Sequence, residues 1–206
     1  MWTAAILAGG EARRLGGLDK SGLAVGTGKN PRSMLDRQLA VLRDLTPHIL
    51  IVDGASDRHQ SRQWPADVRV IHDRIPGAGA LGGLYTALME ATTEQVLVIA
   101  CDMPFLTKPF VAHLAALGAE SNGPARADVV LPRDQHGRHP LCASYHRRSA
   151  PVLKAGIDAG NLRVLDAITR LVVREIGPDD LALFDRDGQL LMNVNTPADY
   201  ERALQS

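Results

Sequence analysis

The chain has 206 residues, 45% of them apolar, and its 23 basic residues balance 23 acidic ones. This length and apolar content suffice for one packed domain, and a net charge of zero gives no overall field to concentrate nucleic acid. Its two cysteines have no metal-ligand spacing and no apolar run nears the ~18 residues that span a bilayer, so we expect a cytoplasmic protein without nucleic-acid or membrane partners.

The first element is an apolar strand, predicted over residues 3–8, and a glycine-rich loop with three basic side chains follows it. Glycines let the main chain approach a ligand closely, and turned backbone N–H groups bind anions. Arg13 and Arg14 can each fork onto two phosphate oxygens, while Lys20 supplies a point charge. This pattern predicts a phosphate-binding loop, although a strand–loop–helix unit can also use glycines for its turn alone.

Beyond the loop, apolar runs alternate with segments of helical period. Strands are predicted over 48–52, 68–71, 95–101, 128–131 and 171–176, and helices over 32–45, 81–91, 108–117 and 150–159. Such alternation is typical of crossover helices around a mostly parallel sheet, and strands that are apolar throughout suit a sheet covered on both faces. We therefore expect a three-layer α/β fold that forms a single domain over residues 1–206.

Polar residues follow the first four predicted strands. The glycine loop follows the first strand, and Asp53, Asp73 and Asp102 come after or near the ends of the next three. Ligands of parallel sheets bind outside the carboxyl ends of the strands, so these residues are expected to meet at one edge with a nucleotide. An Asp in such a place can also serve only as a turn or helix cap, and for Asp53 and Asp73 this alternative stays open.

Asp102 is a carboxylate at the end of an apolar strand. Burying a carboxylate is costly unless it is paired or bound to a cation, and Mg²⁺ commonly takes one or two carboxylates together with phosphate oxygens of the substrate. Asp102 is therefore the predicted metal ligand. The alternative is that it caps a helix beginning near Thr107.

A second glycine cluster, residues 77–84, contains a formal G-x-G-x-x-G. This pattern could indicate a dinucleotide-binding oxidoreductase, whose glycine turn directly follows its strand. Here residues 73–76 separate the predicted strand from the first glycine, and a better phosphate loop already follows the first strand. The nucleotide-binding prediction therefore stays with the first loop.

Several motifs, taken in order, resemble those of the molybdenum cofactor guanylyltransferase family, over nearly the whole chain. They are Leu7–Lys20, Val70–Asp73, Gly79–Gly83, Cys101–Leu106, Gly137–Leu141, Gly160–Leu165 and Met192–Tyr200. The resemblance implies a Rossmann-like nucleotidyltransferase fold and transfer of GMP from GTP to the phosphate of Mo-molybdopterin, with release of pyrophosphate. It implies Mg²⁺ as cofactor, GTP and Mo-molybdopterin as substrates, and molybdoenzymes or their chaperones as further partners.

The resemblance also implies roles for individual residues, with residues 1–106 mainly serving GTP and Mg²⁺ and residues 107–206 mainly serving the acceptor. The implied nucleotide-binding residues are Leu7, Ala8, Gly9, Gly10, Lys20, Asp53, Asp73 and Asp102. The implied catalytic residues are Lys20, Arg14 and Asp102, the last as the Mg²⁺ ligand, and the implied acceptor-binding residues are His139, Arg163, Asn193 and Asn195. His139 could instead brace a strand, and Thr196-Pro197 also has the form of a helix start.

Guanine as the donor base depends mainly on Gly9, because the cytidylyltransferase relatives tend to have alanine at the corresponding step. A CTP-dependent molybdopterin cytidylyltransferase is therefore the nearest alternative. A non-catalytic nucleotide-binding module that serves molybdoenzyme maturation is the alternative from another class, and the presence of both Lys20 and Asp102 argues against it.

Overall fold

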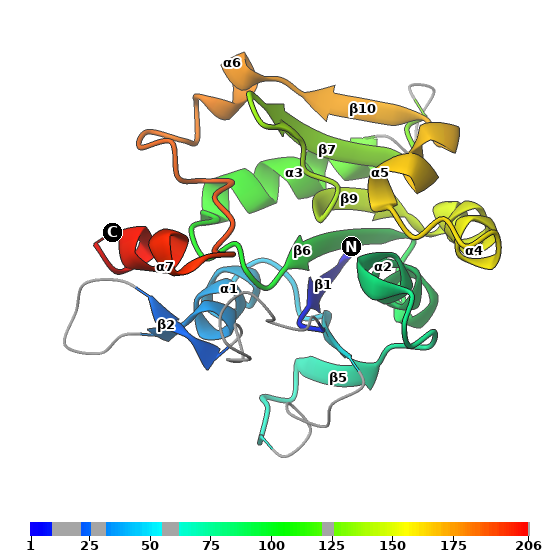
Figure 1. Ribbon diagram of the computed structural model, residues 1–206, viewed down its shortest axis with the longest axis horizontal. Coiled ribbons are helices and arrows are strands. Elements are labelled where there is room, and N and C mark those ends of the chain that lie inside the picture. Colours follow the sequence, from blue (N-terminus) through cyan, green and yellow to red (C-terminus); the bar gives the residue numbers. More distant parts are fainter. Residues whose placement is uncertain (10–21, 26–31, 55–61, 121–125, 206) are drawn as a thin grey trace.

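Figure 1 shows the computed structural model of the chain, which describes residues 1–9, 22–25, 32–54, 62–120 and 126–205. Eight strands of the described part form the central sheet. They are β1 (Thr3–Leu7), β4 (Ile49–Asp53), β5 (Val68–His72), β6 (Gln95–Ala100), β7 (Val129–Asp134), β8 (Gly137–Arg138), β9 (Cys142–His146) and β10 (Val173–Ile176). All six predicted strands are therefore confirmed, with ends shifted by at most three residues.

The strand order is β10-β7-β9-β6-β1-β4-β5, with β8 paired to β7. The pairs β1–β4, β1–β6, β4–β5 and β10–β7 are parallel, whereas β9 runs antiparallel to both β6 and β7. The sheet is thus mostly parallel, as predicted. The sequence prediction had no strand at β9, which joins the two parallel parts of the sheet.

The helices lie on both faces of the sheet (Figure 1). They are α1 (Met34–Leu42), α2 (Gly79–Glu90), α3 (Lys108–Glu120), α4 (Ala150–Asp158), α5 (Val164–Ala167), α6 (Pro178–Leu181) and α7 (Pro197–Leu204). The four helices predicted from periodicity are all present. Helix α1 begins later than predicted because Ser33 caps it, its side chain accepting a hydrogen bond from the Asp36 backbone N–H.

Two apolar cores lie on opposite faces of the sheet. Alternate residues of β1 point to opposite faces, so that Ala4 and Ile6 pack with α1 and α3, while Ala5 and Leu7 pack with α2, α4 and α5. This is the expected three-layer arrangement. None of the described helices is long and apolar enough to cross a membrane.

A smaller cluster holds the C-terminal helix against the β2–β3 hairpin (Ala24–Val25 and Arg32–Ser33). Its core residues are Val25, Met34, Val194 and Ala203. The Tyr200 hydroxyl also donates to the Ala24 carbonyl over 2.8 Å. The C-terminal segment is thereby attached to the N-terminal part of the chain.

Helix α7 starts where the sequence predicted a helix start. The Thr196 side chain accepts from the Asp199 backbone N–H, and the Asp199 carboxylate accepts from the Thr196 backbone N–H. Pro197 occupies the first turn, where a missing N–H costs nothing. This reciprocal cap fixes the point at which the preceding segment, residues 192–195, ends.

Candidate nucleotide-binding site

The ends of β1, β4, β5 and β6 meet at one edge of the sheet, as the sequence predicted. Strand β1 lies between β4 and β6, so the chain moves outward from β1 through β4 to β5 and then crosses back to β6. The Cys101 N–H donates to the Leu7 carbonyl (3.1 Å) and the Ala8 N–H to the Val52 carbonyl (2.9 Å). This is the reversal point of strand order at which parallel sheets bind ligands.

Gly9 enters the glycine loop in close contact with Gly54, the residue after β4. A Cβ atom at Gly9 would come within 2.7 Å of the Gly54 nitrogen and 2.9 Å of its Cα. Because these are backbone atoms, there is no room for a side chain, so this chain needs glycine here for packing, whatever the donor base. The predicted site residues Gly10, Arg14 and Lys20 lie outside the described residues.

Asp102 lies in a tight turn that directly follows β6. The Met103 N–H closes the turn on the Ala100 carbonyl over 3.3 Å, and the Asp102 carbonyl accepts from the Val194 N–H over 2.8 Å. The turn is thus held on one side by β1, through Cys101, and on the other by the segment that precedes α7. Asp102 itself is partly buried.

Gln38 of α1 holds the same turn from below the sheet edge. Its side-chain Nε2 donates to the carbonyls of Ala100 (2.8 Å) and Met103 (3.0 Å). The sequence prediction missed Gln38. The available signal was a polar residue on the apolar face of α1, in helical register with Leu35 and Leu42.

The donors near Asp102 fit a magnesium ion that is shared with a substrate. Among the described residues, no three His, Cys, Asp or Glu side chains gather into a group that could hold a metal by itself. Mg²⁺ keeps several waters and often binds through one or two carboxylates plus substrate phosphates, so it does not require such a group. A single partly buried carboxylate at the reversal point of the sheet is consistent with that mode of binding.

Asp53 and Asp73 lie side by side at the ends of β4 and β5, where the Asp73 N–H donates to the Asp53 carbonyl over 3.0 Å. Asp53 is only 2% exposed. The Asp73 carboxylate braces its own turn, because its Oδ1 accepts from the Ile75 N–H (3.0 Å) and from the Thr86 hydroxyl (2.9 Å). The turn role that the sequence left open for Asp73 is therefore present, and nucleotide contact by Asp53 and Asp73 stays a prediction.

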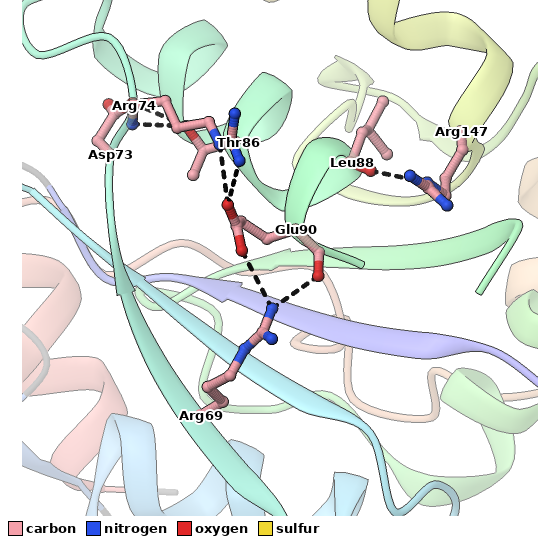
Figure 2. A network of polar contacts seen from close by, with 7 residues as sticks. All are labelled: Arg69, Asp73, Arg74, Thr86, Leu88, Glu90 and Arg147. Carbon is pink, nitrogen blue, oxygen red and sulfur yellow. Dashed lines mark hydrogen bonds and ion pairs between the residues drawn. The ribbon is translucent and has the colours of Figure 1, made fainter. Parts of the chain in front are cut away.

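Figure 2 shows how the turn after β5 is attached to α2. Arg74, which follows Asp73, pairs with Glu90 at 2.6 Å, and Arg69 of β5 reaches the other oxygen of Glu90 at 3.2 Å. Both arginines are about half exposed, so these ion pairs contribute little to the stability of the fold.

Gly82 lets the turn after β5 approach α2. A Cβ at this position would lie 2.9 Å from the Asp73 Oδ2, the Ile75 carbonyl oxygen and the Ala78 Cβ. Gly77 and Gly79 adopt φ values of 89° and 59°, which favour glycine, just before and at the start of α2. The glycines of this cluster thus have packing and turn roles.

His139 and Arg163 come from the other half of the chain. The His139 Nε2 lies 3.0 Å from the Asp134 carboxylate, and its backbone N–H donates to Pro132, so it braces the β7–β8 hairpin. Burial would raise the pKa of Asp134, but hydrogen bonds from the His139 side chain and the His136 backbone lower it below its usual value. Arg163 is exposed and directly precedes α5, and its acceptor role stays a prediction.

Asn193 and Asn195 flank Val194, whose N–H binds the Asp102 carbonyl. The backbone of this segment therefore lies beside the predicted metal ligand, although 91 residues separate Asp102 from Asn193 in sequence. Asn193 is exposed, and the Asn195 N–H donates to Asp199 over 3.1 Å. The role of Asn193 and Asn195 in acceptor binding stays a prediction.

Residues 4–172 match the family described as the MobA-like NTP transferase domain. A probable molybdenum cofactor guanylyltransferase from Chloroflexus aggregans is 34% identical over 204 residues, covering 98% of this chain and 92% of the relative. The chain belongs to the molybdenum cofactor guanylyltransferase family.

Solved structures agree with this family membership. Molybdopterin-guanine dinucleotide biosynthesis protein A from Archaeoglobus fulgidus is 27% identical with a TM-score of 0.82, over 99% of this chain and 97% of that one. Rv0371C from Mycobacterium tuberculosis, solved as a complex with manganese, has the same fold at 18% identity and a TM-score of 0.67, over 98% and 97% of the two chains.

Membership in the guanylyltransferase family makes the chain a nucleotidyltransferase. It decides between two predictions for the G-x-G-x-x-G of residues 77–82, because the family is not one of dinucleotide-binding oxidoreductases. It also favours an enzyme over a non-catalytic binding module.

Proposed function

We propose that this chain transfers GMP from GTP to the terminal phosphate of Mo-molybdopterin, forming the guanine dinucleotide cofactor and pyrophosphate. The observation that carries the proposal is the position of the Asp102 turn. It lies between the end of β1 at Leu7 and the segment around Val194, and hydrogen bonds join it to both. A nucleotide triphosphate on one side and an acceptor phosphate on the other would meet at this carboxylate.

Attack of one anion on another is the main obstacle to this reaction, so catalysis consists of alignment and charge neutralisation. Arg14 and Lys20 are proposed to stabilise the triphosphate and the leaving pyrophosphate. Asp102 is proposed to hold Mg²⁺, which when bound withdraws charge from the phosphate oxygens. The manganese complex of Rv0371C supports a divalent cation in a protein of this fold.

The main chain of Leu7, Ala8 and Gly9 is proposed to contact the base. The Ala8 N–H is already used by the Val52 carbonyl, so a base contact at Ala8 uses its carbonyl oxygen. A carbonyl accepts hydrogen bonds from the N–H donors of guanine, which suits a purine with an exocyclic amine.

We assign residues 1–106 mainly to GTP and Mg²⁺ and residues 107–206 mainly to the acceptor. Asp53 and Asp73 belong to the first part, and His139, Arg163, Asn193 and Asn195 belong to the second. Support comes from the Val194–Asp102 hydrogen bond, which brings the end of the second part to the edge of the first.

The experiment is a donor comparison with purified protein, Mg²⁺ and Mo-molybdopterin, in which pyrophosphate release is measured with GTP and with CTP. The proposal predicts release with GTP and little with CTP. Release with CTP alone would identify a cytidylyltransferase instead, and release with neither donor would contradict nucleotidyl transfer to this acceptor.

A further inference from the structure

A buried glutamine interrupts the apolar face of α1. Gln38 is 3% exposed and lies in helical register with Leu35, Leu39 and Leu42, all of which pack into the core below the sheet. Glutamine is seldom buried to this extent, because its amide must then find partners within the protein. The partners of Gln38 therefore indicate why the position is polar.

Both partners belong to the turn that carries Asp102. The amide nitrogen of Gln38 donates to the carbonyls of Ala100 and Met103, which are the two ends of that turn. Because both partners are carbonyls, the atom that faces them must be the NH₂ group, and both of its hydrogens are used. Gln38 thus holds the two ends of the turn together through one planar group.

The other end of the same amide has no hydrogen bond among the described residues. The Gln38 Oε1 is buried and unpartnered. An unpaired buried acceptor destabilises a fold, so a leucine or methionine would be the simpler residue at this core position. The Gln38 amide therefore combines one unfavourable unpaired oxygen with the two favourable hydrogen bonds of its NH₂ group.

We propose that Gln38 is a positioning residue that sets the place of the Asp102 carboxylate relative to the end of β1. It acts through the Ala100 and Met103 carbonyls and does not touch substrate. The proposal rests on the proposed function, in which Asp102 holds the Mg²⁺ that accompanies GTP. Catalytic side chains need such supporting contacts, because small displacements of a reacting group are costly.

Gln95 supplies a matched control. It lies at the amino end of β6, whereas the Asp102 turn follows the carboxyl end of that strand. It is 4% exposed, its Nε2 donates to the Ser144 hydroxyl, and its Oε1 is also buried without a partner among the described residues. It joins β6 to β9 at the amino end of β6 and lies against Gly118 of α3, away from the Asp102 turn. Gln38→Met and Gln95→Met therefore each remove a buried side-chain amide, but only the first removes contacts of the Asp102 turn.

The measurement is GTP binding by calorimetry with and without Mg²⁺, together with kcat and the Mg²⁺ concentration for half-maximal pyrophosphate release. Losing two hydrogen bonds from the turn should weaken Mg²⁺-dependent GTP binding about tenfold in Gln38→Met and raise the Mg²⁺ requirement by a similar factor. GTP binding without Mg²⁺ should stay within about twofold of wild type. Both methionine variants should have lower melting temperatures than wild type, but Gln95→Met should leave the Mg²⁺ dependence unchanged.

An unchanged Mg²⁺ dependence in folded Gln38→Met would overturn the proposal, as would equal changes in the two methionine variants. If Gln38→Met fails to fold, Gln38→Asn decides, because it keeps a neutral amide but is one methylene too short to hold both carbonyls. Gln38→Asn must then show the raised Mg²⁺ requirement, with Gln95→Asn as its control. If wild type itself shows no Mg²⁺-dependent GTP binding, the proposed function is wrong and this inference falls with it.

Discussion

Two turns at the same edge of the sheet each carry an aspartate, and they are held in different ways. The turn after β5 is held by its own aspartate side chain, since the Asp73 Oδ1 binds Ile75 and Thr86. The turn after β6 is held through its main chain, by Gln38, Leu7 and Val194. The comparison shows that similar strand-end positions can serve different purposes. Asp73 braces its loop, whereas the Asp102 turn is held by surrounding elements, which suits the metal ligand that we propose Asp102 to be.

The largest expected effect comes from Asp102→Asn. The substitution keeps the shape of the side chain and removes its charge, so Mg²⁺-dependent pyrophosphate release should fall by roughly 10²–10³-fold. The melting temperature should stay close to that of wild type, because asparagine has the same shape and the main-chain hydrogen bonds of the turn are unchanged. Steady-state kinetics and a thermal melt check both points, and retention of more than a tenth of wild-type activity would contradict the metal-ligand assignment.

Gly82→Ala should disturb the turn after β5 directly. The new methyl group would lie 2.9 Å from the Ile75 carbonyl and the Ala78 Cβ, so we expect a loss of about 1–3 kcal/mol of unfolding free energy. Gly83→Ala is the control in the same helix, because its Cβ would meet only Leu7 and Val52 at 3.6 Å or more. That variant should be neutral or more stable by up to about 1 kcal/mol. Urea denaturation of both proteins measures the difference, and equal stabilities would show that the turn is free to move.

Thr86→Val separates the two roles considered for Asp73. It removes the hydroxyl that binds the Asp73 carboxylate and leaves the carboxylate in place. We expect Thr86→Val and Asp73→Asn each to cost about 1–2 kcal/mol of stability. If bracing is the whole role of Asp73, both variants should change the GTP KM alike. A much larger KM increase in Asp73→Asn than in Thr86→Val would instead show a direct nucleotide contact.

The smallest effect concerns the segment that reaches the Asp102 turn. Asp199 caps α7 and binds the Asn195 and Thr196 N–H groups. Asp199→Asn should therefore cost about 1 kcal/mol near pH 7. Burial raises the pKa of Asp199, but the hydrogen bonds that it accepts, mainly from Thr196 and Asn195, outweigh burial. The pKa of Asp199 is therefore lower than its usual value.

The sign of the pH dependence follows from that lowered pKa. A carboxylate with a folded pKa below the unfolded one stabilises the protein above the unfolded value of about 4, and this stabilisation is lost as pH falls through the folded pKa. The stability difference between wild type and Asp199→Asn should thus shrink below about pH 4. Denaturation curves at several pH values test this, and a difference that grows in acid would have the wrong sign.

Much of the fold was predictable because its parallel strands are short apolar runs separated by amphipathic helices. Strand β9 was missed because its sequence, Cys-Ala-Ser-Tyr-His, is not a continuous apolar run. Its Ser144 is buried against Gln95, and its Tyr145 hydroxyl donates to the Pro140 carbonyl, so polar atoms in this strand are satisfied by tertiary contacts. Such contacts cannot be derived from periodicity.

The candidate site, too, has features that the sequence could predict and features that only the tertiary structure shows. Asp102 could be predicted from its place after an apolar strand, and Asp73 has a similar place in sequence. Only the tertiary structure distinguishes them, because Thr86 lies 13 residues beyond Asp73 on α2 and Gln38 lies far before Asp102 on α1. Gly9 is a further case, since the residue that the resemblance links to guanine is also required by the backbone of Gly54.

The most direct test of the central claim follows the phosphorus atoms of GTP. Protein, Mg²⁺ and Mo-molybdopterin are incubated with GTP labelled at either the α- or the γ-phosphate, and the acceptor is separated from pyrophosphate. The account predicts that the α label enters the acceptor and the γ label leaves as pyrophosphate. Label from the γ position in the acceptor, or an α label that never reaches it, would contradict guanylyl transfer by this chain.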